Sequence, residues 1–252
     1  KWVAEFKGSK AKTPAEAADG AEYIFTCVGN DSDLREVTFG DNGIFKTIKK
    51  GAIYVDNTTA SATIAREIYE FAKKNGFGSL DAPVSGGQAG AENGALTVMI
   101  GGDQADFDKV KDKIDCYSKK TKLLGGAGNG QLAKMVNQIC IAGLLQGLSE
   151  GLLFAESENL NMDKLLSAIS GGAAQSWQMV NRGKTMHQRE FDFGFAIKWM
   201  VKDLGYCLDQ AEGNNTKLAF TQEIYDRYTN LMDKGHTYSD TSALMMFDEL
   251  NK

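Results

Sequence analysis

The sequence predicts an α/β protein in which a doubly wound parallel sheet is followed by an all-α C-terminal domain. Short apolar runs that end in glycine or polar residues alternate with amphipathic segments over the first half of the chain, which is typical of strand–helix alternation in such a sheet. From about Asn129 the strand signals give way to helical ones. We therefore expect two domains, residues 1–126 and 127–252.

The elements of the first half follow from local signals. Thr13-Pro14-Ala15-Glu16 predicts a helix start, with an N-cap threonine, a proline at the first helical position and a capping-box glutamate. Gly76 predicts the end of another helix, because glycine readily takes the left-handed conformation found there. We predict strands over 23–29, 52–58, up to Asp81, 96–102 and 121–126, and helices from 14, from 31, over 62–76 and around 107–114.

Composition limits the classes of function. The 252 residues are 42% hydrophobic and carry a net charge of -5. This acidic balance does not indicate the basic surface that nucleic-acid binding needs. No uninterrupted apolar run reaches the ~18 residues of a membrane span, and the first residues resemble neither a signal nor a transit peptide. The chain has two histidines and four scattered cysteines without CxxC spacing. We therefore expect no metal site, no disulfide framework and a cytoplasmic location.

The second half begins with a stretch that lacks proline. NGQLAKMVNQICIAGLLQGLSEGLLFAES, residues 129–157, predicts one helix of roughly 40 Å at about 1.5 Å per residue. Gly143, Gly147 and Gly151 recur every fourth residue and form one ridge. Because glycine within a helix costs about 1 kcal/mol relative to alanine, we expect this ridge to pack closely against another helix.

The first candidate site lies in DAPVSGGQAGAENGALTVMIGG, Asp81–Gly102. Ser85, Gly86 and Gly87 follow a predicted strand. Consecutive glycines let backbone N–H groups approach an anion, and the serine hydroxyl adds a donor. A carboxylate or a phosphate is the expected ligand, and a long turn between two strands is the alternative.

The second candidate is LLGGAGNGQLAKMVNQ, Leu123–Gln138, where a glycine cluster runs into a helix. The first N–H groups of a helix can point at a ligand. Lys134 lies one turn into the helix, and Asn137 and Gln138 follow on the same face. The segment lacks both GK[ST] and GxGxxG. The alternative is a lysine that extends to solvent beside surface amides.

The third candidate is FGFAIKWMVKDLGYCLDQ, Phe193–Gln210, in which Lys198 and Lys202 are four residues apart. An amphipathic helix with a solvated basic edge is the alternative. A tryptophan upstream, Trp177, is more often a core residue than a ligand contact.

Together these segments resemble the β-hydroxyacid dehydrogenase family, which includes 3-hydroxyisobutyrate dehydrogenase and tartronate semialdehyde reductase. The Asp81–Gly102 stretch is similar to the family's substrate-binding signature, GAGNGQLAKMVNQ to its catalytic-lysine segment, VDNTTASATIAR to its VDxSTxxPxxAR segment and WMVKDLGYCLDQA to its KDL helix. Thr58 stands where the family usually has serine, and Gln138 where most members have asparagine. The resemblance covers essentially the whole chain, in order.

The resemblance implies a Rossmann-like first domain and NAD(P)-dependent oxidation of a small 3-hydroxy acid, with NAD or NADP as the cofactor. A lysine that acts as the base needs a pKa well below its usual value of about 10.4. By resemblance, the catalytic residues are Lys134 as general acid/base with Gln138 and Asn137. The substrate-binding residues are Ser85, Gly86, Gly87 and Trp177, and the cofactor-binding residues are Val28, Gly29, Thr59 and Lys202.

The resemblance leaves alternatives open. A reductase of tartronate semialdehyde, succinic semialdehyde or glyoxylate, an L-serine dehydrogenase and a non-catalytic fragment are the other candidates. Members of the family begin with a strand, GxGxxG and a helix, so we expect about 35 residues to be missing before the first residue here and pyrophosphate binding to be weakened. We expect a homodimer or a homotetramer, with no nucleic-acid or membrane partner.

Overall fold

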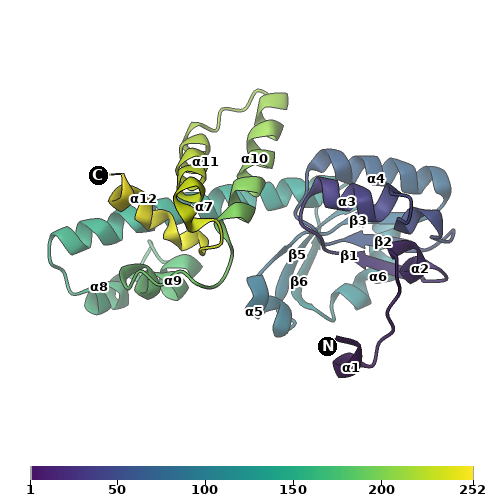
Figure 1. Ribbon diagram of the computed structural model, residues 1–252, viewed down its shortest axis with the longest axis horizontal. Helices are drawn as coiled ribbons and strands as arrows, with labels where there is room; N and C mark the ends of the chain where they lie inside the picture. Colours follow the sequence, from purple (N-terminus) through teal and green to yellow (C-terminus); the bar gives the residue numbers. More distant parts are fainter. Residues whose placement is uncertain (1, 252) are drawn as a thin grey trace. The chain divides into compact units, whose positions relative to one another are not determined.

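The computed structural model describes residues 2–251 (Figure 1). The chain forms two compact units, Lys1–Lys134 and Met135–Lys252, so the division falls inside the long helix α7, Asn129–Ser157. The first unit carries the sheet and the second is helical, and the predicted α/β fold class with an all-α second part is confirmed.

The sheet of the first unit has the strand order β1-β2-β3-β5-β4, with β6 paired to β5. The strands are β1 Tyr23–Thr26, β2 Ile53–Asp56, β3 Gly78–Asp81, β4 Val84–Ser85, β5 Leu96–Gly102 and β6 Ser118–Leu123. β1, β2 and β3 are parallel, as predicted, and β6 is parallel to β5, but β5 runs antiparallel to both β3 and β4. The sheet is therefore mixed, because the link from β3 to β5 forms β4 and a short helix and contains no crossover helix, which a parallel pair needs.

Helices cover both faces of this sheet. Tyr54 packs into a core with residues of α3, Asp31–Phe39, and α4, Ala62–Asn75. Its neighbours Ile53 and Val55 pack into a second core with α6, Gln104–Ile114. Successive side chains of a strand point to opposite faces, so one buried strand supplies both cores. This arrangement is the doubly wound one.

The predicted helix ends are confirmed. Thr13 caps α2, Pro14–Ala18, by accepting a hydrogen bond from Glu16 N. Gly76 ends α4 at φ 80°, as predicted. Ser61, which was not predicted as a cap, accepts a hydrogen bond from Ile64 N at the start of α4. Several elements of the first unit were not predicted: α1 Trp2–Phe6, the 3₁₀ turn Ile44–Lys46, β4 Val84–Ser85 and α5 Gly87–Glu92.

The second unit contains the rest of α7 and further helices around a core that includes Leu145, Leu204 and Tyr228. The helices after α7 are α8 Met162–Ile169, α9 Trp177–His187, α10 Ile197–Gly213, α11 Ala219–Leu231 and α12 Met246–Leu250, with a π-helical turn at Met232–His236 and a 3₁₀ turn at Thr241–Met245. Tyr228 is fully buried and its hydroxyl donates to the carbonyl oxygen of Thr241 at 2.9 Å.

The glycine ridge of α7 does not pack as predicted. A Cβ on Gly143 would lie 3.6 Å from Phe220, but a Cβ on Gly147 or Gly151 would meet no atom within 4 Å outside its own helix in the described chain. The expectation of close packing is therefore wrong for these two glycines within the chain. They line an apolar groove of about 590 Å³ together with side chains such as Leu148 and Phe154.

α7 is also long and apolar enough to cross a membrane, by length and composition alone. Of its most apolar window, 44% is buried inside the protein. The core helix of a soluble protein passes the same test, so this feature is weak evidence for a membrane span.

Candidate active site

The carboxyl ends of three parallel strands meet at one edge of the first unit. Thr26 of β1 stands beside Asp56 of β2, which in turn stands beside Asp81 of β3. The segments that follow these strands therefore begin at the same edge, where ligands bind in doubly wound sheets. The predicted cofactor residues Val28, Gly29 and Thr59 lie on two of these segments.

Asp56 is buried at this edge and holds it together. Its Oδ1 accepts hydrogen bonds from Thr26 Oγ1 at 2.9 Å and from Thr58 N at 3.0 Å. Burial raises the pKa of Asp56 to about 6, although the hydrogen bonds from Thr58 and Thr26 oppose that rise. The sequence signal for this structural role of Asp56 was an acidic residue at the end of a buried apolar strand.

The predicted cofactor residues are partly committed to the protein itself. Val28 N donates to Thr58 Oγ1 at 3.0 Å, and Gly29 N donates to Asp33 Oδ2 at 3.1 Å. These N–H groups therefore fix the loop and are not offered to a ligand. Val28 and Thr59 are half-buried, so what this edge presents is their side chains and the surface around Gly29.

The Ser85-Gly86-Gly87 segment is more structured than the predicted loop. Ser85 ends β4, Gly86 is the N-cap of α5, and Gly87 begins that helix, Gly87–Glu92. Gly86 and Gly87 have φ values of 138° and 62°, which other L-residues adopt only with strain. Gly86 has no side chain to accept from the first turn of α5, whose N–H groups have no partner inside the helix. The segment keeps the features that suit an anion.

The glycine cluster before α7 binds a carboxylate of the protein itself. Asp81 accepts hydrogen bonds from Gly128 N at 2.8 Å and from Gln131 N at 2.9 Å. These N–H groups were expected to point at a ligand, and that interpretation is wrong for both of them. A Cβ on Gly130 would lie 2.5 Å from the carbonyl oxygen of Asp81, so the missing side chain lets the helix start against β3. Burial raises the pKa of Asp81, and these backbone hydrogen bonds oppose the rise.

Lys134 lies on α7 one turn beyond Gln131. It is only 7% exposed, which excludes the alternative of a lysine extended to solvent. The first turn of its helix is fixed against Asp81, and a Cβ on Gly130 would also lie 2.6 Å from the carbonyl oxygen of Met99. Ser85 pairs with Thr97, two residues before Met99. The lysine helix and the serine–glycine segment are thus anchored to the same strand, β5.

In the second unit, the predicted polar residues form a chain of contacts. Asn137 Nδ2 donates to Gln138 Oε1 at 2.8 Å, and Gln138 Nε2 donates to Asp203 Oδ2 at 2.7 Å. Lys202 Nζ lies 3.2 Å from Asp203 Oδ1. Gln138 and Asp203 are both 2% exposed. Asp203 was not predicted as a site residue, although it adjoins Lys202 in the sequence.

Lys202 also lies over aromatic rings. Its Nζ is 5.7 Å from the ring centroid of Trp199 and 5.4 Å from that of Tyr206. Such contacts orient the ammonium group. The predicted lysine is therefore held by a carboxylate and two rings in place of a solvated edge.

Trp177 has a different environment from these hydrogen-bonded polar residues. It begins α9 and is 57% exposed, with the guanidinium of Arg182 5.0 Å from its ring centroid. The bland interpretation of Trp177 as a core residue is wrong.

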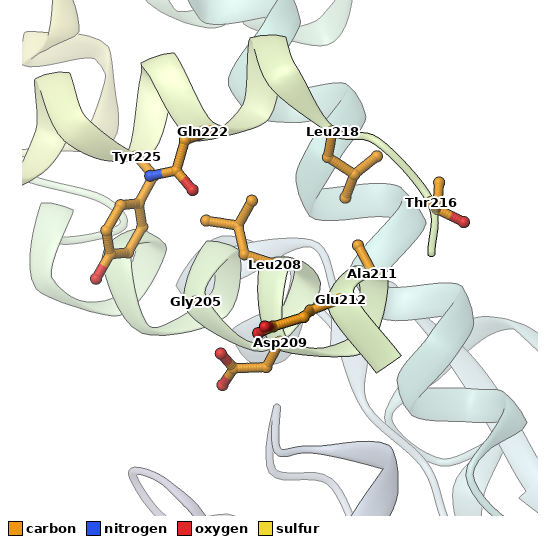
Figure 2. A pocket seen from close by; sticks show the side chains of 9 residues that line it. All are labelled: Gly205, Leu208, Asp209, Ala211, Glu212, Thr216, Leu218, Gln222 and Tyr225. Atoms are coloured by element: carbon orange, nitrogen blue, oxygen red, sulfur yellow. The ribbon is translucent and has the colours of Figure 1, made fainter. Parts of the chain in front are cut away.

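A separate polar pocket lies between α10 and α11 in the second unit (Figure 2). It has a volume of about 460 Å³, and Asp209 and Glu212 supply its carboxylates. Its lining includes none of the sequence-predicted site residues, so it is distinct from the site described above.

Comparisons with known proteins define the class to which this fold and site belong. Residues 1–126 match a family model described as the NAD-binding domain of 6-phosphogluconate dehydrogenase. Residues 128–247 match one described as NAD-binding of NADP-dependent 3-hydroxyisobutyrate dehydrogenase. The chain is therefore an NAD(P)-dependent oxidoreductase of the hydroxyacid dehydrogenase class, and the prediction of NAD or NADP as the cofactor is confirmed.

Individual relatives agree with this class. The chain is 56% identical over 244 residues to an uncharacterized oxidoreductase of Shewanella frigidimarina, covering 97% of this chain and 84% of the relative. It is 34% identical to 2-hydroxy-3-oxopropionate reductase of Escherichia coli, covering 95% and 82%. The crystal structure of 3-hydroxyisobutyrate dehydrogenase from Salmonella typhimurium is similar at a TM-score of 0.83 and 26% identity, covering 92% and 81%. The chain belongs to the β-hydroxyacid dehydrogenase family, in its 3-hydroxyisobutyrate dehydrogenase branch.

Proposed function

We propose that this protein oxidises a small 3-hydroxy acid of the 3-hydroxyisobutyrate type to the corresponding aldehyde acid, and catalyses the reverse reduction. The observation that carries the proposal is Lys134, a buried lysine on a helix whose first turn is fixed against the sheet by Asp81. The Ser85-Gly86-Gly87 segment, anchored to the same strand, supports it.

Lys134 is the proposed general acid/base. In the oxidation, neutral Nζ takes the hydroxyl proton while the carbon bearing that hydroxyl loses hydride and becomes a carbonyl carbon. In the reduction, protonated Nζ donates to the carbonyl oxygen. When bound, the nicotinamide supplies the hydride acceptor or donor. A positioned acid/base contributes about 10²- to 10⁴-fold to such a step.

The proposed role of Ser85, Gly86 and Gly87 is to hold the carboxylate of the substrate. The hydroxyl of Ser85 and the first N–H groups of α5 are donors of the required kind, and the two glycines in left-handed conformations let an anion come close. A fixed carboxylate would orient the hydroxyl-bearing carbon.

Val28, Gly29 and Thr59 are the proposed cofactor-side residues of the first unit. The residues present fit that role, because both segments follow parallel strands at one edge and the Asp56 hydrogen bonds hold them there. Thr59 is half-buried beside this network. In the second unit, we propose Lys202 for the cofactor, Trp177 for the substrate, and Asn137 and Gln138 as polar residues assisting Lys134.

The Lys134→Met variant tests the proposal. We expect kcat to fall by about 10³-fold while the dissociation constant of the reduced cofactor, measured by fluorescence titration, changes less than about twofold. The matched control is Lys120→Met, which removes an exposed lysine of β6 and should leave both values unchanged. Turnover retained by Lys134→Met would overturn the assignment.

Reduction of a small aldehyde acid, such as tartronate semialdehyde, succinic semialdehyde or glyoxylate, is a second candidate. The similarity to 2-hydroxy-3-oxopropionate reductase of Escherichia coli supports it. L-Serine oxidation is a third, because a 3-hydroxyisobutyrate dehydrogenase of Mycobacterium tuberculosis, 25% identical with a TM-score of 0.84, is described with L-serine. A substrate panel with NAD and NADP decides among them, and absence of cofactor binding would favour a non-catalytic role.

We also propose a homo-oligomer, a homodimer or a homotetramer, in a reducing compartment such as the cytoplasm. Exposed apolar side chains of the second unit, including Phe154, Val180 and Phe220, support the first part, and the small number of scattered cysteines, without CxxC spacing, supports the second. Light scattering after gel filtration tests the oligomer, and a mass of about 27.3 kDa would contradict it.

A further inference from the structure

The side-chain amide of Gln131, in the first turn of α7, bonds to the backbone on both sides of Thr59, one of the proposed cofactor-side residues. Its Nε2 donates to the carbonyl oxygen of Thr58 at 2.8 Å, and its Oε1 accepts from Ala60 N at 3.1 Å. The residue between these two partners is Thr59. The glutamine is 1% exposed, and a reversed amide would face both bonds with like groups, so the two partners fix its orientation.

The backbone of Gln131 is itself fixed. Its N–H donates to Asp81 Oδ2 at 2.9 Å, and Gly128 N donates to Oδ1 of the same carboxylate at 2.8 Å. Gly130, between them, has no side chain and lies against the backbone of β3. The amide of Gln131 therefore starts from a rigid point of the sheet.

The other side of the segment is held independently. Thr58 N donates to Asp56 Oδ1 at 3.0 Å, and Thr58 Oγ1 accepts from Val28 N at 3.0 Å. Thr58 and Ala60 are each 1% exposed, whereas Thr59 between them is only half-buried. The protein thus locks both neighbours of the one residue that this short segment presents at its surface.

We infer that Gln131 is a positioning residue. It holds the backbone of Thr59 in place for the nicotinamide cofactor and fixes the position of Thr59 relative to the helix that carries Lys134. The inference rests on the proposed function for the role of Thr59. Gln131 and Lys134 are three residues apart on α7, so the side chain that holds Thr59 and the proposed acid/base belong to one rigid turn. A buried amide whose oxygen and nitrogen are both hydrogen-bonded contributes little net stability, and its main effect is to orient the backbone that it contacts.

The test compares Gln131→Met, which keeps the length of the side chain and loses both hydrogen bonds, with Gln131→Glu, which keeps the acceptor for Ala60 N and places a carboxylate against the carbonyl oxygen of Thr58. The matched control is Gln146→Met, which removes another buried glutamine of α7 whose Nε2 donates only to Glu150 at 2.7 Å among the described residues. The readouts are the dissociation constant of the reduced cofactor, kcat, the substrate KM and the exchange rate of the Ala60 amide.

For Gln131→Met we expect the cofactor to bind about tenfold more weakly and kcat to fall by about 10- to 100-fold, with little change in substrate KM, because small misplacements of reacting groups have effects of this size. Exchange of the Ala60 amide should accelerate in Gln131→Met and stay slow in Gln131→Glu. Gln146→Met should match the wild type in all four readouts.

A Gln131→Met protein that melts at a lower temperature but keeps wild-type cofactor affinity and kcat would overturn the inference, because its role would then be structural alone. If Gln131→Met fails to fold, the same cofactor titration is made on Gln131→Glu. Weaker cofactor binding then supports the inference, and wild-type affinity overturns it. If the wild type oxidises no substrate of the panel, the proposed function fails by itself. The cofactor affinity of the variants still decides the positioning role, because NAD(P) binding follows from the family and not from the substrate.

Discussion

Gln138 Nε2 donates a hydrogen bond of 2.7 Å to Asp203 Oδ2, and both side chains are almost fully buried. This contact joins α7 to α10 inside the second unit. By the resemblance, Gln138 occupies the position at which the family usually has asparagine, whose amide would start one methylene closer to the backbone. The residue that departs from the family pattern is thus the one that bonds to Asp203.

Gln138→Asn should shorten that reach and leave the Asp203 carboxylate without this donor. We expect a loss of about 1–3 kcal/mol in the free energy of unfolding, measured by urea denaturation, and a lower kcat if the proposed role is right. Gln222→Asn on α11, where the amide is exposed and bonds to Asp226, is the control and should cost less than about 0.5 kcal/mol. Equal effects of the two substitutions would contradict this account.

Gly130→Ala should be strongly destabilising. Its Cβ would meet the carbonyl oxygens of Asp81 and Met99 at 2.5 and 2.6 Å, so the start of α7 must move away from the sheet. We expect a loss of about 3 kcal/mol or more by thermal or urea unfolding. Gly126→Ala, four residues earlier, is the control, because a Cβ there meets nothing within 4 Å in the described chain. Similar stabilities for the two variants would refute the close approach.

Asp56 should make the protein less stable as the pH rises. Burial raises the pKa of its carboxyl from the ordinary aspartate value of 3.8 to about 6 in the fold, so the folded state holds the proton more tightly. The stabilisation is complete below pH ~4 and is lost as the pH rises through ~6, a difference of about 3 kcal/mol. Asp56→Asn should remove most of this fall between pH 4 and pH 7 while retaining an oxygen acceptor.

The measurement is the free energy of unfolding in urea at a series of pH values. Burial also raises the pKa of Asp81, so a fall of the same sign from that carboxyl should remain in Asp56→Asn. The exposed Asp192 offers a control, Asp192→Asn, which should keep the wild-type slope. The hypothesis fails if Asp56→Asn keeps it too.

Arg189 should support the second unit at low pH through Glu156. Its Nη2 lies 2.7 Å from Glu156 Oε2 and 2.5 Å from Glu249 Oε1. The hydrogen bond from Arg189, with a further one from His187, lowers the pKa of Glu156 from 4.5 to about 2. Because the folded pKa is depressed, the stabilisation is present above pH ~4.5 and is lost as the pH falls toward ~2.

Arg189→Met should therefore cost about 2 kcal/mol at pH 7 and weaken the dependence of stability on pH between 2 and 4.5. Arg35→Met is the control, because the Arg35–Glu67 pair lies on the surface, where such pairs contribute about 0–1 kcal/mol. Unfolding monitored by circular dichroism at pH 7 and pH 3 gives both values. No difference between the two variants at pH 7 would contradict a cooperative role for Arg189.

Much of the fold could be predicted because its signals are local. The threonine–proline start at Thr13 and the glycine end at Gly76 need only neighbouring residues. The course of β5 could not be predicted, because an apolar strand looks the same in either direction. Its antiparallel pairing with β3 depends on the structure of the connecting segment, which forms β4 and the short helix α5 and contains no crossover helix.

The candidate site shows the same division. Sequence patterns picked out Lys134 and the Ser85-Gly86-Gly87 segment, since a lysine or consecutive glycines in an apolar setting need a reason. They missed Asp81 and Gln131, whose partners lie 47 to 73 residues away in the chain. Free N–H groups at a helix start look alike in the sequence whether a ligand or the protein's own carboxylate accepts from them.

The sequence by itself determined the class of fold, the family, the cofactor class and the residue types available for the chemistry, because periodicity, caps and ordered motifs are properties of the chain. The tertiary structure decided which of those groups are free to meet a ligand. It assigned the N–H groups of Gly128 and Gln131 to Asp81 and left Gly147 in an open groove. The physical reason is that hydrogen-bond partners and packing neighbours depend on distance in space, which local patterns do not specify.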